Sequence, residues 1–296
     1  MRARAIALMI ACYVGWGGGA VAMKFALESF SVLQVMTARV AVPALLYLAL
    51  WPRWKNPPYR RGDWKWLLLA VACEPCLFFF CITTAMRFTT ASEAGVITAL
   101  LPLATALGAR LFLKEKLPGR ALAGLALALP GIIGLNLFSA GGGNAPAPLM
   151  GNALVFAGIL FSAGYTLCIR HLADRYSGLF LSAVQALGGS LVFVPLCFFT
   201  PAPGEVTPAA VGALCYLGFG IGILVYLGFN YSLRWVKAGL AGALANVTPL
   251  VTLGAAALLL DERLNPAQLS CAGLALLGTA VATGAFLGEK GRKTGE

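Results

Sequence analysis

The stretch "ASEAGVITALLPLATALGARLFLKEKL" (residues 91–117) decides the fold, because it recurs 147 residues later as "AGLAGALANVTPLVTLGAAALLLDERL" (residues 238–264). Of the 27 aligned positions, 11 are identical, among them Pro102 with Pro249. Similarity at a fixed offset indicates that one structural unit occurs twice. The chain therefore divides into two similar halves, residues 1–143 and 149–296, and the uncharged, flexible stretch "SAGGGNAPAP" is the expected joint between them.

The composition places both halves in a membrane. Hydrophobic residues make up 59% of the chain and charged residues 11%, whereas soluble domains average roughly 45–50% and about 25%. An apolar helix of about 20 residues spans a bilayer. Ten such segments are expected, at residues 5–23, 32–51, 66–86, 91–112, 120–139, 150–169, 179–199, 209–233, 238–260 and 267–287. We therefore predict an all-α integral membrane protein with ten transmembrane helices.

Each half contributes five spans, and five is an odd number. The second half therefore enters the membrane from the opposite side, and the two five-helix repeats are inverted relative to each other (5+5). This arrangement is typical of secondary transporters, whose halves rock around a central site. Some channels also have inverted repeats, so a passive channel stays open as an alternative. Glu115 and Glu262 close the two repeated stretches, and we expect a structural, topology-setting role for both.

The net charge of +11 follows the expected topology. With the N terminus placed in the cytoplasm, 18 of the 22 lysines and arginines fall on the cytoplasmic side. A bias of this kind sets the orientation of membrane proteins. We therefore expect a multi-pass protein of the cytoplasmic (inner) membrane with both termini in the cytoplasm. Because topology accounts for the charge, no nucleic-acid partner is expected.

All eight cysteines fall within expected spans, where they are typical of small apolar packing residues. Cys73 and Cys76 have the spacing of a redox motif, but such motifs need an exposed helix start that stabilises the thiolate. The sequence contains no nucleotide-binding loop, metal triad or nucleophile–base set. We therefore expect no enzyme activity, no catalytic residue, no metal and no cofactor. A membrane-embedded enzyme using Cys73, Glu74 and Cys76 is kept as an alternative.

The stretch "WGGGAVAMKFALESFSVLQVMTAR" (residues 16–39) resembles the opening of EamA-type carriers in the drug/metabolite transporter superfamily. In that family a Trp-Gly pair precedes a lysine at the end of helix 1, and an arginine follows in helix 2. The repeated stretches at residues 91–117 and 238–264 also resemble the family pattern. The resemblance implies ten helices, a central cavity and transport of small metabolites, frequently amino acids and often outward.

The two halves differ at the charged positions of this pattern. The residue that matches Arg39 in the second half is Ala186, and the residue that matches Lys24 is His171. Charged recognition is therefore expected to rest mostly on the first half.

Glu74 is the deepest acid of the sequence and lies within "VACEPCLFFF" (residues 71–80). Ionisable groups inside a bilayer are costly and usually face a cavity or a partner. Pro75 removes a backbone donor and predicts a kink. Freed carbonyls and a carboxylate would form a pocket for a cation, an ammonium group or a proton. The alternative is structural, an ion pair between Glu74 and Arg39 that holds two helices together.

Three further charged residues are candidates. Arg39 either pairs with Glu74, binds a substrate carboxylate through its planar fork, or anchors packed helices. Lys24 lies near the far end of the first span, where it either reaches the membrane interface or gates the outer mouth. Glu93 starts the fourth span and is expected to pair with Arg87 or Lys24, as a gate or as a solvated helix cap.

Aromatic and amide side chains complete the candidate site. Trp16, Phe78 and Tyr226 are predicted to form walls of the cavity. Asn230 lies one turn after Tyr226 on the same helix face, and Asn246 precedes a Thr-Pro pair. For each polar residue, helix–helix hydrogen bonding is the alternative to substrate contact.

The sequence thus predicts a secondary transporter that moves a small polar metabolite by alternating access. An amino acid is the favoured small-molecule substrate and export the favoured direction. The alternatives are an exporter of amines, drugs or nucleosides, and a passive channel. The protein is expected to act in the lipid bilayer as a monomer or a homodimer.

Overall fold

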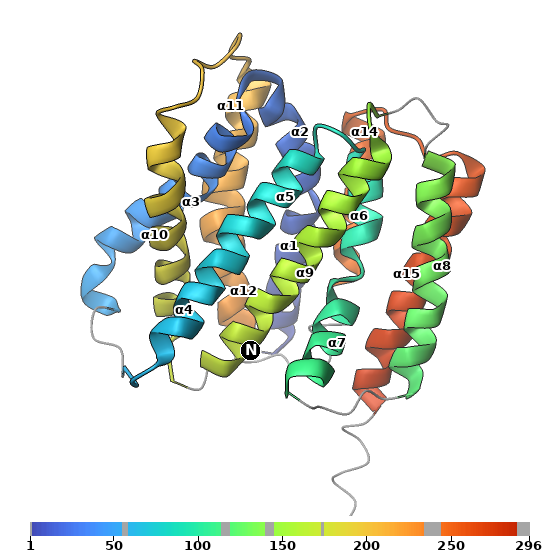
Figure 1. Ribbon diagram of the computed structural model, residues 1–296, viewed down its shortest axis with the longest axis horizontal. Coiled ribbons are helices and arrows are strands. Elements are labelled where there is room, and N and C mark those ends of the chain that lie inside the picture. The colour runs from blue at the N-terminus through green and yellow to red at the C-terminus, as the bar shows by residue number, and fades with distance from the viewer. Residues whose placement is uncertain are drawn as a thin grey trace, which may run out of the picture.

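The computed structural model describes residues 2–54, 59–113, 119–139, 145–172, 175–233 and 244–288. Within these ranges the regular structure is entirely helical, and the helices run roughly alongside one another as a bundle (Figure 1). The first helix begins at the lower end of the bundle in that view, which we call the N-terminal face. The opposite end is called the far face.

The helices of the first half include several short pieces. They are α1 (Arg2–Gly17), α2 (Gly19–Ser29), α3 (Val32–Ala49), the short turn Trp51–Arg53, α4 (Asp63–Val71), the wide turns η2 (Ala72–Leu77), α5 (Phe78–Ala85), α6 (Ala91–Thr98), α7 (Leu101–Leu113) and α8 (Gly119–Ser139).

The second half repeats this order. Its helices are α9 (Pro148–Leu172), α10 (Gly178–Cys197), α11 (Pro208–Cys215), the wide turns η3 (Tyr216–Val225), α12 (Tyr226–Leu233), α14 (Val247–Leu259) and α15 (Pro266–Gly288). Seven helical stretches are long and apolar enough to cross a bilayer. Three shorter apolar helices complete the set, at Leu122–Phe138, Val247–Leu259 and Pro266–Ala282. The predicted fold class, an all-α membrane protein with ten spans, is confirmed.

The spans are irregular at corresponding places in the two halves. The 147-residue offset moves Ala72–Leu77 onto residues 219–224, which lie inside Tyr216–Val225, so both third spans of the repeats contain wide π-type turns. It also moves the break between α6 and α7 onto the start of α14 at Val247. Wide turns of this type are frequent at functional sites. The repeat therefore preserves its irregularities as well as its spans.

Proline explains two of these features. Pro102 and Pro249 lie in the first turns of α7 and α14, where a missing amide hydrogen costs little because the first amides of a helix have no partner within it. At the "EPC" stretch, Glu74 leaves the helical conformation (φ −146°, ψ 120°) immediately before Pro75. The kink predicted at this position is therefore present.

Hydroxyl side chains start several helices. Ser31 and Gln34 form a capping box at the start of α3. Thr90, Ser177 and Thr207 accept backbone amides at the starts of α6, α10 and α11. Such caps satisfy amides that have no intrahelical partner, and they mark where each of these helices begins.

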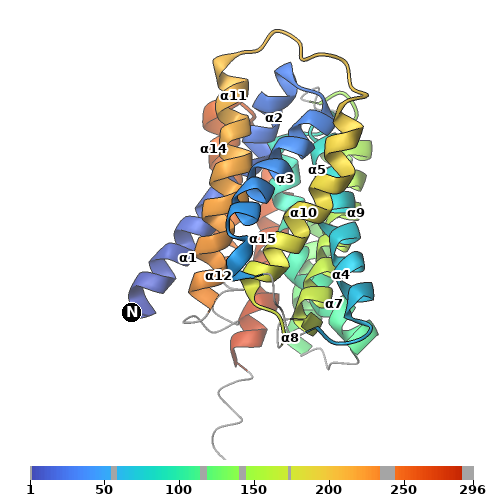
Figure 2. The same ribbon diagram turned by 90° about the vertical axis from the view of Figure 1, so that its left-hand side faces the viewer.

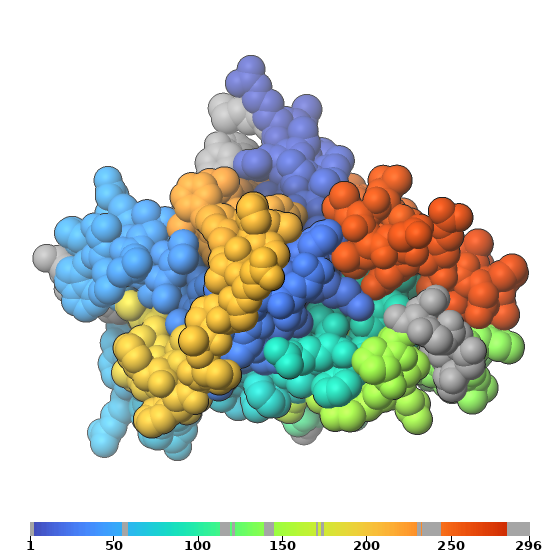
Figure 3. Space-filling model, turned by 90° about the horizontal axis from the view of Figure 1, so that it is seen from above, coloured from blue at the N-terminus to red at the C-terminus, as the bar shows by residue number. Residues whose placement is uncertain are grey.

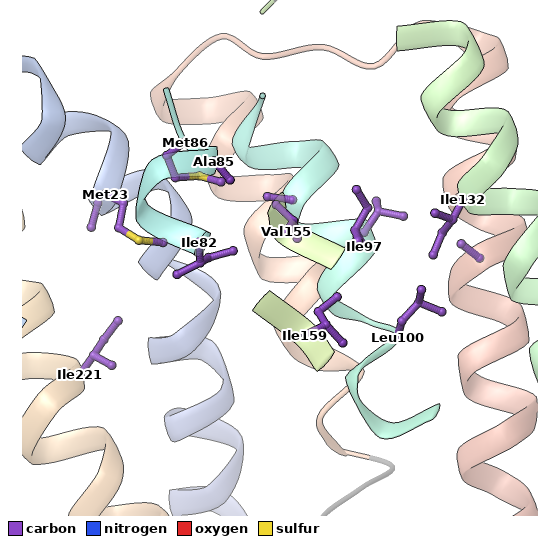
Figure 4. Packing of buried hydrophobic residues seen from close by; sticks show 14 of the residues in the cluster. Met23, Ile82, Ala85, Met86, Ile97, Leu100, Ile132, Val155, Ile159 and Ile221 are labelled. Atoms are coloured by element: carbon purple, nitrogen blue, oxygen red, sulfur yellow. The ribbon is translucent and has the colours of Figure 1, made fainter. Parts of the chain in front are cut away.

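Helices of the two halves pair across the molecule. Near the edges of the bundle, α3 packs against α10 and α8 packs against α15. Figure 1 shows the second pair and Figure 2 the first. Between them, Met23, Ile82, Val155 and Ile159 belong to one buried apolar cluster, which Figure 4 shows joining helices of both halves. This cluster fixes the framework around the irregular segments.

The contact between α8 and α15 depends on glycine. A Cβ added at Gly278 would lie 2.5 Å from the Ala128 nitrogen and 2.6 Å from the Gly124 oxygen, whereas a Cβ at Gly273 of the same helix would meet nothing within 4 Å. Small residues at such crossings allow helix backbones to approach closely.

We expect Gly278→Ala to destabilise the protein by about 1–3 kcal/mol, because the added methyl forces two backbones apart. Gly273→Ala is the matched control, and it should leave stability unchanged or raise it through better helix propensity. Thermal unfolding in detergent measures both. Equal melting temperatures for the two variants would contradict the packing described.

Candidate functional site

A central cavity of about 570 Å³ lies between the two halves. The irregular middles of the spans form its wall, including the α1–α2 region, the segment around Glu74, the α6–α7 break and the start of α14. Six of the predicted site residues line it, namely Trp16, Arg39, Glu74, Phe78, Tyr226 and Asn246. A smaller cavity of about 30 Å³, large enough for a water molecule, is also lined by Arg39 and Tyr226.

Glu74 is buried, with 4% of its surface exposed. Tyr226 donates its hydroxyl to Oε1 of Glu74 at 2.9 Å, and Ser162 donates to Oε2 at 3.0 Å. Both donors belong to the second half of the chain. Each carboxylate oxygen thus has one neutral donor, and an oxygen can accept a second hydrogen bond. The carboxylate is held in place and can still receive a ligand.

Arg39 lies on α3 and has no carboxylate partner among the residues that the structure describes. Its Nη1 donates to the Met23 sulfur at 3.4 Å, and its guanidinium carbon lies 3.8 Å from the centre of the Phe79 ring. A sulfur acceptor and a ring face are weak partners for a guanidinium with five N–H groups. The ion pair considered between Glu74 and Arg39 is not formed in this conformation.

Four aromatic rings meet beside Glu74. The Trp16 ring lies 5.4 Å from that of Tyr226 and 4.9 Å from that of Phe229, both edge to face. Tyr13 contacts Trp16 and Phe229 at 5.7 and 5.8 Å. Edge-to-face pairs stabilise one another, so α1 and α12 present a rigid aromatic wall that is continuous with the carboxylate.

Hydroxyl groups of the second half hold the first span. Thr252 donates to the Gly17 carbonyl at 2.8 Å, Thr248 to the Tyr13 carbonyl at 3.2 Å, and Tyr216 to the Gly15 carbonyl. A Cβ at Gly17 would lie 2.6 Å from Val251, so α1 and α14 pack closely here. The side chain of Asn230 lies outside the described residues.

Lys24 makes an ion pair between the halves near the far face. Its Nζ lies 3.2 Å from Oε1 of Glu262. Glu262 also accepts the amides of Ala91 and Ser92, at 3.1 and 2.9 Å, and so caps the start of α6. Glu262 therefore has the structural role expected for it, while Glu115 lies outside the described residues. Lys24 pairs with Glu262 and not with Glu93.

Glu93 is buried, with 2% of its surface exposed, and is not a solvated cap. Its Oε2 accepts Asn152 at 2.7 Å and Thr89 at 3.1 Å, and its Oε1 accepts Gln268 at 3.3 Å. The expected pairing with Arg87 or Lys24 is therefore wrong. Since Asn152 is on α9 and Gln268 on α15, Glu93 links α6 to two helices of the second half.

No three His, Cys, Asp or Glu residues gather as a metal site in the described part of the chain. All eight cysteines are free thiols, and Cys73 is buried.

The EamA-like transporter family matches residues 3–137 and 149–284. The chain belongs to this family. The two matches correspond to the two repeats, and they confirm the resemblance found in the sequence. The protein is thus a membrane transporter rather than an enzyme, and it acts on a small-molecule substrate in the lipid bilayer.

Relatives of this EamA-like transporter are named as transporters. An uncharacterized transporter YetK of Bacillus subtilis (strain 168) is 27% identical over 63% of this chain, and the match spans 58% of that protein. An uncharacterized transporter of Archaeoglobus fulgidus is 24% identical over 89% of this chain and 92% of its own. A probable terminal-alkyne amino-acid exporter of Streptantibioticus cattleyicolor is 22% identical over 97% of this chain and 96% of its own.

A solved crystal structure superposes on the EamA-like transporter with a TM-score of 0.64. It is 18% identical and covers 99% of this chain and 100% of its own. This similarity supports the fold.

Sequence reasoning missed several contacts of the site. Ser162 and Tyr165 both line the cavity from α9. They are one turn apart, which places them on one helix face, so this spacing could have identified Ser162 from the sequence. The partners that Glu262 and Glu93 find on other helices carried no local signal, because they lie more than 50 residues away in the sequence; Thr89, four residues before Glu93, is the local exception.

Glu262→Gln should lower the melting temperature more than Lys24→Gln. The first substitution removes an anion that accepts two amides and pairs with Lys24, and hydrogen bonds to charged groups contribute about 1.5–3 kcal/mol each. The second removes only a partly exposed ion pair, which contributes about 1 kcal/mol or less.

The control is Asp261→Asn, since the ion pair of Asp261 with Arg263 is 84% exposed on both sides. Asparagine also tolerates the positive φ of 50° at this position. Thermal unfolding in detergent should therefore rank the variants Glu262→Gln, Lys24→Gln and Asp261→Asn, from least to most stable. A Lys24→Gln variant at least as unstable as Glu262→Gln would contradict the capping role.

Proposed function

We propose that this EamA-like transporter carries an amino acid across the cytoplasmic membrane by alternating access, with export as the favoured direction. One observation carries the proposal. A single cavity contains a carboxylate with only neutral donors, Glu74, and a guanidinium without a carboxylate partner in the described structure, Arg39. A zwitterion would supply a cation for the Glu74 carboxylate and an anion for the Arg39 guanidinium.

The two ends of an amino acid match the two groups. Its ammonium group would bind Glu74 and face the ring of Trp16, because carboxylates and aromatic faces both attract cations. Its carboxylate would bind the fork of Arg39 in a bidentate pair. Tyr226 donates to Glu74 and belongs to the aromatic wall, so it couples the charged and the apolar parts of the site.

The apolar lining favours a substrate with a carbon side chain. Phe78, Ile82, Ile159 and Phe229 line the same cavity. Ligand sites are mostly apolar, with a few polar groups that fix orientation. Asn246, at the start of α14, is the amide that we assign to substrate contact from the second half, together with Asn230.

The halves, residues 1–143 and 149–296, would rock against each other around this site. In the conformation described, Lys24 and Glu262 connect the halves at the far face, and Glu93 adds a second connection. In Figure 3, which looks onto that face, segments of both halves lie packed together. We assign the gate to Lys24 and Glu93, whose contacts must separate when the cavity opens on this side.

The orientation follows from the distribution of basic residues, which supports cytoplasmic termini. The relative named as a probable terminal-alkyne amino-acid exporter supports both the substrate class and the direction. The transporter would work as a monomer or a homodimer, since one chain contains the whole cavity.

Counterflow of labelled amino acids into proteoliposomes tests the proposal. The wild type should show saturable counterflow of at least one amino acid. Glu74→Gln should reduce it about tenfold or more, because a charged hydrogen bond to the ammonium group is replaced by a neutral one. Glu28→Gln is the matched control, since Glu28 is exposed and lies outside the cavity, and it should retain wild-type counterflow.

Equal counterflow in wild type and Glu74→Gln would remove Glu74 from the recognition site. Counterflow of amines or nucleosides but of no amino acid would replace the substrate class with the alternative. Flux without saturation or counterflow would indicate a channel.

A further inference from the structure

The connection between α3 and α4 concentrates aromatic and basic side chains. The stretch "WPRWKNPPYRRGDWKW" (Trp51–Trp66) contains four of the six tryptophans of the chain, one tyrosine and five basic residues. Residues 55–58 lie outside the described structure. Of the remainder, we define the headgroup patch as Arg53, Arg60, Arg61, Trp64 and Lys65, all of which are exposed.

The only acidic residue of this stretch, Asp63, is buried and paired with residues outside the patch. Asp63 is 4% exposed. Its Oδ1 pairs with Arg175 at 2.8 Å, and its Oδ2 accepts the hydroxyl of Tyr176 at 3.0 Å. Arg175, in the connection between α9 and α10, thus balances the charge of this carboxylate. The carboxylate therefore does not offset the charge of the exposed cations beside it.

The four cations of the patch have no carboxylate partner in the part of the chain that the structure describes. Neighbouring cations repel one another, and a cluster without counter-charge attracts anions. The patch therefore presents net positive charge to whatever surrounds it.

The adjoining side chains set the depth of the patch in the bilayer. Trp64 is 53% exposed and lies on the same face of α4 as Leu68, which is 61% exposed. Exposed leucines on a membrane span face lipid tails, and tryptophan prefers the headgroup level. Arg60 and Arg61 precede Trp64 in the chain, on the side away from Leu68, which places them beside the headgroups. The Lys65 ammonium lies 5.9 Å from the Trp64 ring.

The patch is also firmly attached to the bundle. Trp54 is buried, and its Nε1 donates to the Tyr47 carbonyl of α3 at 2.8 Å. Asp63 connects the start of α4 to the second half through Arg175. Because Trp54 and Asp63 are held in this way, the described residues beside them lose less entropy on binding.

We propose that the headgroup patch binds the phosphate of an anionic phospholipid. Arg60, Arg61 and Lys65 bind the phosphate oxygens, and Trp64 packs against the glycerol and the upper acyl chains. Topology alone accounts for the positive charge of the stretch. It does not account for the burial of Asp63 against Arg175 and Tyr176, which leaves the exposed cations of the patch without a carboxylate beside them and so favours a bound anion.

Binding of phosphatidylglycerol to the full chain in a neutral detergent tests the proposal, with the shift in melting temperature as the readout. The wild type should be stabilised by phosphatidylglycerol at low salt. Arg60→Gln/Arg61→Gln should require roughly tenfold more lipid for the same shift, since each cation near an anionic surface contributes to binding. Salt at about 0.5 M should weaken binding to the wild type because it screens exposed charges.

Two controls accompany this variant. Arg4→Gln/Arg110→Gln removes the same charge from two exposed positions outside the patch and should behave as the wild type. Arg60→Lys/Arg61→Lys keeps the charge and should retain most of the binding. The melting temperature and gel-filtration profile without lipid establish that every variant is folded.

Several results would overturn the proposal. They are an unchanged lipid requirement in Arg60→Gln/Arg61→Gln, an equal loss in Arg4→Gln/Arg110→Gln, equal stabilisation by phosphatidylcholine, and an equal effect of free inorganic phosphate. The readout is binding and not transport, so it does not depend on the substrate of the cavity.

Discussion

Inside a bilayer every backbone hydrogen-bonding group needs a partner within the protein, and the centre of this molecule depends on how that requirement is met. At the break between α1 and α2, backbone carbonyls beside Gly18 accept side-chain hydroxyls. Hydroxyls of Thr252 and Tyr216 satisfy those of Gly17 and Gly15 from the other half of the chain. The break in the first span is thus held by contacts with the second half.

This arrangement makes a polar cavity possible between apolar helices. A regular helix has no free backbone groups and would place Glu74 on a lipid-facing or packed surface. The extended conformation at Glu74 directs the carboxylate to Tyr226 and Ser162 of the second half. Arg39 comes from α3 of the first half and packs on Phe79, five residues after Glu74, so the two charges of the site rest on neighbouring elements.

The sequence predicted the ten spans, the repeat and most of the cavity, because these follow from apolar length, from periodicity and from the cost of charge in lipid. The cost of charge in lipid pointed to Arg39 and Glu74, both of which line the cavity. The ion pair of Lys24 with Glu262 and the surroundings of Glu93 were not predicted. Those contacts join residues that are far apart in the chain, and their geometry depends on how the inverted halves pack.

The proposed function depends most on recognition of the substrate carboxylate by Arg39. The test measures how tightly the wild type and Arg39→Gln bind a transported amino acid. It repeats the measurement with the amino-acid amide, in which a neutral carboxamide replaces the carboxylate. We predict that the amide binds the wild type at least about tenfold more weakly than the amino acid, and that Arg39→Gln binds both with similar affinity. If the amide lost as much affinity in Arg39→Gln as in the wild type, the carboxylate would be recognised elsewhere, and the role assigned to Arg39 would be wrong.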